Sequence, residues 1–576
     1  MNTPDFSHPN KFLRNAGFGA LLLVMALYYT IMQWFAADIP FCDEYIVALQ
    51  WLDTSNQIEG MNEKFLHLFS QANEHRHFTF TLAVLTDYNL FGTINFKRLL
   101  WAGNIGLVLM LYLVNLLNQT DRRNPWIVLP VAFLLFAPQN EITNWPLVAF
   151  AAILQTSLII ASLYLLSRSG WLNLAAAVTF AVIATFSFGN GMFTFAVGFL
   201  VLALKKPSPP IAWLIWSVVM ALAIFLYFYT YTFTEESGSL TNALRNPVPI
   251  IQFFLTFFGT IMIRTLHVNL YWVTLAGLIP IVGLGHLILF KWHEVKKQPV
   301  ALSFLLFILI SAALTAVTRQ SFGVTGATAP RYILLQALFL AVLMLLYMNI
   351  YGLQFRWLLP IFLCTTMLLY GVRLVYGIFA LNRHQNHLKE IILAYKTDPE
   401  EIKTAGPDPL EIKRILDRSI ATGVYTPPRV TGKFRSSKPF TPSIKRMVPE
   451  TVKFNLEQFG YDQNILQISG WAFSEDHHQA DLTAGIVLQS GNDTIVLPAL
   501  PAERRDVRRH FKKTFPGLQL NTGFSISANL SRYALPGGTY RIGICILKEK
   551  EIVALKYTAK RIEISPPGGG FNKKTQ

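Results

Sequence analysis

Long apolar runs separated by short polar loops make up the first 380 residues of the chain. The first run, residues 16–35, is long enough to cross a bilayer, whose hydrocarbon core takes about 20 helical residues. Because Lys11 and Arg14 precede it, we expect a retained span that enters from the cytoplasmic side. Further spans are expected at residues 98–118, 126–138, 147–167, 171–187, 191–204, 210–231, 271–290, 300–318, 332–351 and 357–380.

These runs give about eleven spans, and basic residues orient them. The basic residues expected on the side of Lys11 and Arg14 are Arg122, Arg123, Arg168, Lys205, Lys206, Lys291, Lys296, Lys297 and Arg356. The opposite, extracytoplasmic loops are then residues 39–94, 140–146, 187–191, 231–249 and 319–331. Residues 250–263 are apolar but only about 14 residues long, so we leave them out of the count as a re-entrant or interfacial segment.

An odd number of spans places the rest of the chain outside the cell membrane. The pattern predicts a transmembrane domain over residues 1–383, a helical connector and linker over 384–449, a β-sandwich module over 450–565 and a disordered tail over 566–576. Period-two alternation predicts strands at residues 465–472, 484–488, 494–497, 524–528, 540–546 and 561–564. The fold class is therefore a polytopic α-helical membrane protein with a C-terminal extracytoplasmic β-sandwich.

Composition agrees with this class. The 576 residues are 52% hydrophobic and only 14% charged, and the formal net charge is +16. Basic loops and a basic tail suit anionic membrane lipids, so nucleic acid is not an expected partner. The three cysteines, Cys42, Cys364 and Cys545, fit no metal or redox spacing.

Asp43 and Glu44 follow the first span by a few residues, near the expected outer headgroup plane. A carboxylate there can act as a general base on a sugar hydroxyl or coordinate a divalent cation. The alternative is that the two acids cap a helix that starts at Tyr45.

A second polar cluster, residues 73–77, lies in the same loop and contains Glu74, His75 and Arg76. One hypothesis is that Arg76 binds a phosphate or carboxylate through its forked donors, while Glu74 or His75 tunes it. The alternative is an interfacial helix start anchored by polar groups.

Two other outer loops carry candidate binding residues. Arg319, Arg331 and Tyr332 flank a Gly- and Thr-rich loop, where the arginines either bind an anion or extend to the headgroups. Glu141 and Trp145 lie in the loop at 140–146. An indole can stack on a sugar ring, but we favour an interfacial belt position for Trp145.

An N-in first span, an acidic pair directly after it, a long outer loop and many further spans together resemble the GT-C superfamily of integral-membrane glycosyltransferases. The resemblance covers residues 10–380 in architecture and implies a polyprenyl-phosphate-linked sugar as donor. It also implies that Asp43 is the catalytic acid position with Glu44 beside it, and that Arg331 grips the lipid phosphate. The C-terminal part lacks a Trp-Trp-Asp motif, which argues against transfer of an oligosaccharide onto asparagine.

The expected function is an inverting glycosyltransferase of a bacterial inner membrane, which moves a sugar to a cell-surface glycan or lipid on the periplasmic side. It would work with or without a divalent cation such as Mg²⁺ or Mn²⁺, and metal ligands are not identified. The alternative is a lipid-linked glycan translocase or a polymerase-like protein of surface polysaccharide assembly. The C-terminal module resembles small β-rich modules of surface-polysaccharide enzymes, although Trp471, Asp506 and Gly523 also fit simple fold maintenance.

Overall fold

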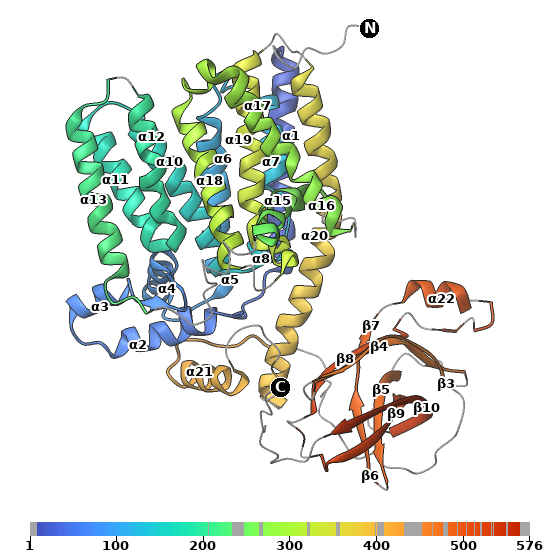
Figure 1. Cartoon of the computed structure of the whole chain (residues 1–576). Helices are drawn as coiled ribbons and strands as arrows, with labels where there is room; N and C mark the ends of the chain where they lie inside the picture. Colours follow the sequence, from blue (N-terminus) through green and yellow to red (C-terminus); the bar gives the residue numbers. More distant parts are fainter. Residues whose placement is uncertain are drawn as a thin grey trace, which may run out of the picture. The chain divides into compact units, whose positions relative to one another are not determined.

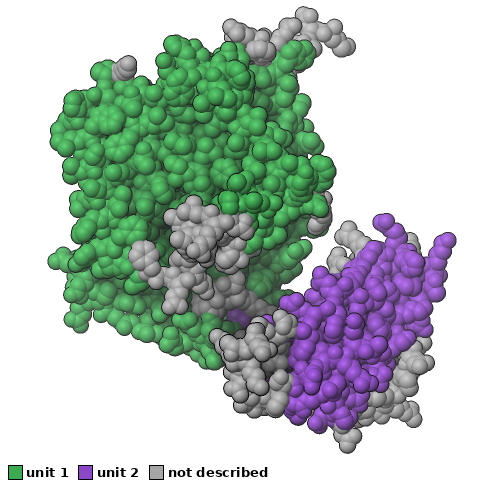
Figure 2. Space-filling model, viewed as in Figure 1, with its two compact units in different colours: residues 1–393, 403–431 green, residues 394–402, 432–576 purple. Residues whose placement is uncertain are grey.

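The structure is a computed structural model that describes most of the chain. The described residues are 9–205, 207–232, 247–263, 269–319, 323–352, 357–397, 399, 402, 408–430, 452–462, 465–475, 482–491, 493–502, 504–511, 513–515, 517–518, 521–530, 533, 535–548 and 551–564. Residues 1–393 and 403–431 form one compact unit, and residues 394–402 and 432–576 form a second (Figure 2).

Among the described residues up to 421, the regular elements are helices apart from one short hairpin, which is formed by β1 (Gln71–Ala72) and β2 (His75–Arg76). Its helices are α1 (Lys11–Phe35), η1 (Tyr45–Gln50), α2 (Trp51–Gln57), α3 (Met61–His67), α4 (Phe78–Phe91), α5 (Phe96–Asn104), α6 (Gly106–Asn115), α7 (Pro125–Leu135), α8 (Asn140–Asn144), α9 (Pro146–Ala149), η2 (Phe150–Leu154), α10 (Gln155–Leu166), α11 (Trp171–Ser187), η3 (Gly189–Met192), α12 (Phe193–Leu204), α13 (Pro210–Phe228), α15 (Pro247–Ile263), α16 (Leu270–Ala276), α17 (Leu278–Val295), α18 (Pro299–Thr318), η6 (Val324–Thr328), η7 (Pro330–Tyr332), α19 (Ile333–Tyr351), α20 (Leu358–Thr397) and α21 (Pro409–Ala421).

Eight of the described helical segments are long and apolar enough to cross a membrane, as expected for a multi-pass membrane protein. They are Lys11–Phe35, Phe96–Asn115, Pro146–Leu166, Pro210–Phe228, Leu270–Val295, Pro299–Thr318, Pro330–Tyr351 and Leu358–Thr397. Shorter apolar helices occupy Pro125–Leu135, Trp171–Ser187, Gly189–Leu204 and Pro247–Ile261. The eleven predicted spans all fall on helices, but three of them are among the shorter ones, so the count of eleven stays a prediction.

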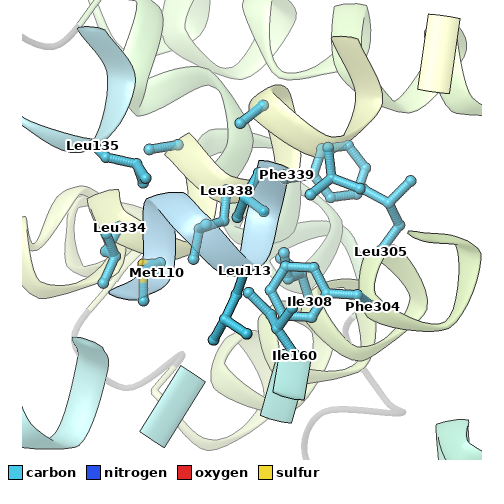
Figure 3. Close-up of a cluster of buried hydrophobic side chains, with 14 of the residues drawn as sticks. Met110, Leu113, Leu135, Ile160, Phe304, Leu305, Ile308, Leu334, Leu338 and Phe339 are labelled. Atoms are coloured by element: carbon cyan, nitrogen blue, oxygen red, sulfur yellow. The ribbon is translucent and has the colours of Figure 1, made fainter. Parts of the chain in front are cut away.

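The interior of the first unit is a continuous cluster of buried apolar side chains. Figure 3 shows part of it, with residues of α6, α7, α10, α18 and α19 meeting in one layer. The labelled residues are Met110, Leu113, Leu135, Ile160, Phe304, Leu305, Ile308, Leu334, Leu338 and Phe339. Lipid tails are as apolar as these side chains, so close packing rather than the hydrophobic effect holds such helices together.

The α15 segment, which we left out of the predicted spans, packs closely against α16. A Cβ atom on Gly259 would lie 1.8 Å from the carbonyl oxygen of Val273, and one on Gly277 would lie 1.8 Å from that of Leu255. Only glycine allows such an approach of two backbones. Figure 1 shows α15 nearly end-on beside the upright α17, α18 and α19, which favours the re-entrant or interfacial interpretation.

Two of the loops that were predicted to share the side of Lys11, those with Arg122 and Lys297, lie at one end of the first unit, whereas Lys206 and Arg356 lie outside the described residues. The indole of Trp126 donates to the carbonyl oxygen of Leu13 at 3.0 Å. The side chain of Asn349 accepts from the backbone of Gln119 at 2.8 Å and donates to Gln298 at 2.6 Å. These bonds connect the start of α1 with α7, and the loops before α7 and α18 with the last turn of α19. Which end faces the cytoplasm stays a prediction.

The opposite end is covered by the first long loop, whose helices α2, α3 and α4 lie far from the start of α1 (Figure 1). Helix α21, in the predicted connector, returns to this loop and packs against η1. Arg418 pairs with Asp53, and the Tyr425 hydroxyl donates to the carbonyl oxygen of Asp38 at 2.8 Å. Residues 384–393 and 403–431 of the predicted connector and linker therefore belong to the first compact unit.

The second unit contains two four-stranded sheets, with strand orders β10-β9-β5-β6 and β3-β4-β8-β7. Its elements are β3 (Val452–Asp462), β4 (Ile465–Ser474), β5 (Leu482–Ser490), β6 (Asp493–Pro498), β7 (Leu500–Ala502), α22 (Arg505–Phe511), β8 (Gly523–Asn529), β9 (Gly538–Lys548) and β10 (Glu551–Ile564). All six predicted strands are present, and both sheets contribute side chains to one buried apolar cluster. The sequence did not reveal β3, β7 or α22.

The motif residues of this second unit make contacts that maintain the fold. Asp506 pairs with Arg504, and Arg504 also binds Glu457. Trp471 packs on the rings of Phe473 and Phe511. These contacts agree with the structural interpretation of Trp471 and Asp506. Gly523 opens β8 directly after a turn, where a Cβ atom would lie 2.7 Å from the Arg504 side chain.

Candidate functional site

Asp43 lies in the short connection between α1 and η1. The backbone at Cys42 has a φ of +48°, which turns the chain before Asp43. The side-chain amide of Asn73 donates to Asp43 Oδ1 at 2.9 Å. Asn73 itself has a φ of +53° and stands at the tip of the β1–β2 hairpin, a conformation that asparagine adopts more readily than most residues. The hairpin thus presents Asn73 to the end of the first span.

Two arginines act electrostatically on the Asp43 carboxylate. Partial burial raises the pKa of Asp43 above its usual value, while the Asn73 hydrogen bond and the charges of Arg331 and Arg319 oppose the rise. The net shift is upward. A carboxylate with a raised pKa accepts a proton more readily and is a better general base near neutral pH.

Arg319 links Asp43 to the second polar cluster. Its guanidinium forms an ion pair with the carboxylate of Glu74. The side chains of Arg319 and Glu74 are 33% and 27% exposed, so both can be reached from solvent. The backbone oxygen of Glu74 accepts from the hydroxyl of Tyr231 at 2.9 Å, which anchors the hairpin to the chain after α13.

Arg331 connects the same site to α8. Its backbone N–H donates to Glu141 Oε2 at 3.1 Å, and its side chain is exposed. The guanidinium lies 5.7 Å from the ring centroid of Tyr332, and that ring in turn packs against Phe257. Five of the predicted residues therefore gather in one network, which we call the acid–arginine cluster: Asp43, Glu74, Glu141, Arg319 and Arg331.

Glu44, the neighbour of Asp43, points away from this cluster. It is completely buried, and its two carboxylate oxygens each accept a 2.9 Å bond, from the backbone N–H groups of Phe41 and Leu147. Burial raises the pKa of Glu44 to about 8, against the lowering effect of these two bonds. Glu44 makes no capping bond to its own helix η1; instead it satisfies an N–H at the start of α9. The predicted cap of the helix at Tyr45 is therefore wrong for Glu44.

Arg76 is buried, and its guanidinium is occupied within the protein. It donates to the carbonyl oxygens of Tyr227 and Tyr229 at 3.0 Å each and to that of Phe69. The bonds to Tyr227 and Tyr229 satisfy carbonyls at the C-terminal end of α13, and the bond to Phe69 ties the first long loop to that end. We therefore leave Arg76 out of the proposed site.

His75 is also enclosed rather than presented to a ligand. Its ring stacks on Phe188 with centroids 3.8 Å apart, and burial lowers its pKa to about 3. The neighbouring His77 has a pKa of about 4 for the same reason. Both imidazoles are thus neutral at pH 7 and supply no positive charge for a phosphate.

Trp145 is not on a surface that could face the headgroups. Its side chain is only 5% exposed and lies edge-on to Phe41, with ring centroids 5.1 Å apart. The predicted interfacial belt position of Trp145 is therefore wrong, because α8 and α9 fold it into the interior. Its indole N–H is buried and has no hydrogen-bond partner among the described residues.

Within the described part of the chain, no group of three or more His, Cys, Asp or Glu side chains is close enough to hold a metal ion. The divalent cation stays a prediction, and no step below depends on it. Asn73 is the residue that sequence reasoning missed. Its place directly before Glu74 in a polar loop was visible, but only the hairpin shows that it reaches Asp43.

The acid–arginine cluster joins four loops that the sequence placed on one side of the membrane: residues 39–94, 140–146, 231–249 and 319–331. Comparison of the chain with protein-family models, with curated proteins and with solved structures finds no match.

Proposed function

We propose that the chain is a GT-C-type glycosyltransferase of a bacterial inner membrane. It moves a sugar from a polyprenyl-phosphate donor to a cell-surface glycan or lipid acceptor on the outer face. In this proposal about eleven spans carry the N-terminus on the cytoplasmic side, and the two β-sheets form a periplasmic β-sandwich. The observation that carries the proposal is the acid–arginine cluster, in which a carboxylate of raised pKa at the end of the first span lies under the influence of two arginines.

The chemistry follows from the charges of this cluster. Asp43 takes the proton of the acceptor hydroxyl, and the freed oxygen attacks the anomeric carbon of the donor. The bond from that carbon to the phosphate oxygen breaks, and polyprenyl phosphate leaves with the electron pair. A single displacement inverts the anomeric configuration. Arg331 and Arg319 stabilise the growing negative charge on the phosphate, so a catalytic acid is not required.

The carboxylates of Glu74 and Glu141 hold the arginines in place. Glu74 pairs with Arg319, and Glu141 accepts from the backbone N–H of Arg331 and attracts its guanidinium electrostatically. The forked donors of Arg331 match the oxygens of an incoming phosphate. We assign Glu74 and Glu141 as positioning residues and Asp43 as the catalytic residue.

A groove in the same unit supports a lipid-linked donor. It has a volume of about 830 Å³ and lies between α4, α5 and η2. Much of its lining is apolar, and such a surface accepts a hydrocarbon chain such as an isoprenoid. The apolar lining residues are Leu82, Ala83, Leu90, Phe91, Leu99, Trp101, Ala102, Phe150 and Leu154.

A translocase of lipid-linked glycans is the second candidate, and one observation favours it. Arg373 is buried within the candidate span Leu358–Thr397, and ionisable groups inside spans often mark transport pathways. A translocase does not need a general base, so the two functions respond differently to loss of the Asp43 charge.

The test is transfer of radiolabelled hexose from polyprenyl phosphate to membrane glycolipid in proteoliposomes that contain the full-length protein. Asp43→Asn keeps the size and most hydrogen bonding, and it should lower turnover about 10²- to 10⁴-fold without loss of folded protein. Glu63→Gln is the matched control, because Glu63 is an exposed carboxylate of the same loop. Wild-type turnover in Asp43→Asn would exclude Asp43 as the base.

A second readout separates the enzyme from the translocase. A fluorescent lipid-linked sugar that crosses the bilayer of these proteoliposomes without a new glycosidic bond, equally in wild type and Asp43→Asn, would favour the translocase. Arg331→Lys should lower turnover, because lysine keeps the charge but loses the forked grip on phosphate. Unchanged turnover in Arg331→Lys would mean that Arg331 does not bind the leaving group.

A further inference from the structure

The buried face of α20 carries polar side chains in the part of the helix that belongs to the first unit. Tyr370, Arg373 and His384 are 8%, 6% and 7% exposed. They follow one another at spacings of three and eleven residues, which places them on one face of a helix. Neighbouring faces of α20 expose Val375 and Phe379, which suit contact with lipid.

Several polar atoms along this face have no partner. Among the described residues, no hydrogen bond reaches the Tyr370 hydroxyl, Arg373 Nη1, His384 Nε2 or the indole N–H of Trp145, although all four are buried. The ring of Phe41 lies beside both His384, at 4.7 Å between centroids, and Trp145, at 5.1 Å. Buried polar atoms are nearly always satisfied, so such a group calls for an explanation.

Among these four groups, Arg373 is the costliest to bury without a partner, because a guanidinium stays charged at every accessible pH. Its one recorded bond runs from Nη2 to Gln139 Oε1 at 3.4 Å, which is long for a hydrogen bond. Among the described residues, no carboxylate pairs with it. A buried cation without a counter-charge is costly, above all within a membrane span.

Arg373 lies within the candidate span Leu358–Thr397, and a later part of the same helix contacts the end of α1. Gln385 donates to the backbone oxygen of Trp34 at 3.3 Å, so this part of α20 lies beside the end of α1. Arg373 comes twelve residues earlier, about 18 Å along the helix. The segment after α7 reaches this depth, because a Cβ atom on Gly377 would lie 2.2 Å from the carbonyl oxygen of Pro138. The unpartnered atoms of His384 and Arg373 thus lie at two depths on one buried face of α20.

We propose that the buried face of α20 holds a phosphate-binding site in which Arg373 is the ionic ligand and Gln139 the second ligand. The forked N–H groups of arginine match two phosphate oxygens, and the amide of Gln139 can donate a further bond. The missing counter-charge and the unpaired Nη1 of Arg373 both fit an anion that hydrogen-bonds strongly. The site is separate from the acid–arginine cluster and does not depend on the proposed transferase activity. A lipid headgroup and free phosphate share this chemistry.

The test measures thermal unfolding of full-length protein in detergent after removal of bound lipid. Titrations use dioleoyl phosphatidic acid, dioleoylglycerol as its neutral counterpart, and inorganic phosphate. A ligand that binds only the folded state raises the unfolding temperature in a saturable manner. We expect such a rise with a phosphate-bearing probe and none with dioleoylglycerol. A response to phosphatidic acid alone identifies a lipid headgroup, whereas a response to inorganic phosphate identifies a site that is open to water.

The decisive variant is Arg373→Met, which keeps an unbranched apolar side chain and removes the charge. It should bind the phosphate probe about 10²-fold more weakly, and without probe it should unfold at the same or a higher temperature than wild type. An arginine with a purely structural role would behave in the opposite way. Arg383→Gln is the matched control, since Arg383 is exposed on the same helix and should respond like wild type.

Gln139→Leu gives an independent test that keeps the arginine. It should weaken phosphate binding about tenfold, because one hydrogen bond to a charged group is lost. The proposal is overturned if neither phosphate probe stabilises the wild type, or if Arg373→Met responds to the probe as strongly as the wild type does.

Discussion

Replacing Arg76 with methionine tests whether this arginine binds a ligand or holds the fold. The sequence suggested a phosphate grip, whereas the structure shows three bonds to backbone carbonyl oxygens, those of Tyr227, Tyr229 and Phe69. Methionine fills a similar volume without donating a hydrogen bond. The substitution therefore removes all three bonds and leaves the end of α13 with unsatisfied carbonyls.

The expected loss is large for a single substitution. One hydrogen bond to a charged group contributes about 1.5–3 kcal/mol, but removal of the charge also relieves its burial. The partners are neutral carbonyl oxygens, so no uncompensated charge remains, and we expect Arg76→Met to lose about 1–3 kcal/mol, the cost of buried acceptors left without a donor. Arg319→Met is the matched comparison, because the Arg319–Glu74 pair is partly exposed and should contribute only about 0–1 kcal/mol.

Unfolding by denaturant in mixed micelles, followed by tryptophan fluorescence, measures the loss of stability. Hexose transfer measures the loss of activity. We expect Arg76→Met to lose stability at a given denaturant concentration and Arg319→Met to lose transfer activity while it stays folded. The reverse pattern, in which Arg76→Met keeps wild-type stability and loses activity, would refute the structural role and restore the ligand hypothesis for Arg76.

Two further predictions follow from the buried acid and from the topology. Burial raises the pKa of the Glu44 carboxyl from 4.5 to about 8 in the folded protein. The protonated carboxyl therefore contributes its full stabilisation below the unfolded-state pKa, and this contribution is lost as the pH rises through the folded-state pKa. Between about pH 5 and pH 9 the unfolding midpoint of the wild type should fall more steeply than that of Glu44→Gln, and equal slopes would contradict the shifted pKa. A reporter that is active only in the cytoplasm, fused after Thr397, should stay inactive, and full activity would mean that the span count is wrong by one.

The sequence alone located most of the secondary structure. The apolar run predicted at residues 171–187 is helix α11 (Trp171–Ser187), and the alternation predicted at residues 484–488 lies within β5 (Leu482–Ser490). Such elements can be predicted because hydrophobic periodicity and the length of an apolar run are properties of neighbouring residues. The same patterns predict a membrane side for each loop from its basic residues and from the number of preceding spans, and that orientation stays a prediction. They missed β3 and β7, and the short β1–β2 hairpin.

Only the tertiary structure decided what each candidate side chain does. Asp43 and Glu44 are adjacent acids, yet the turn at Cys42 and the π-helical η1 send Asp43 toward Asn73 and the arginines, and Glu44 into the interior.

The partners that settle such roles lie far away in sequence. Glu74 and Arg319 are 245 positions apart, and Arg76 lies 151 positions from Tyr227. A local pattern shows that a residue is polar and where its element begins, but not which distant backbone or side chain it will meet. These long-range contacts depend on how the helices pack, and packing is a property of the whole fold.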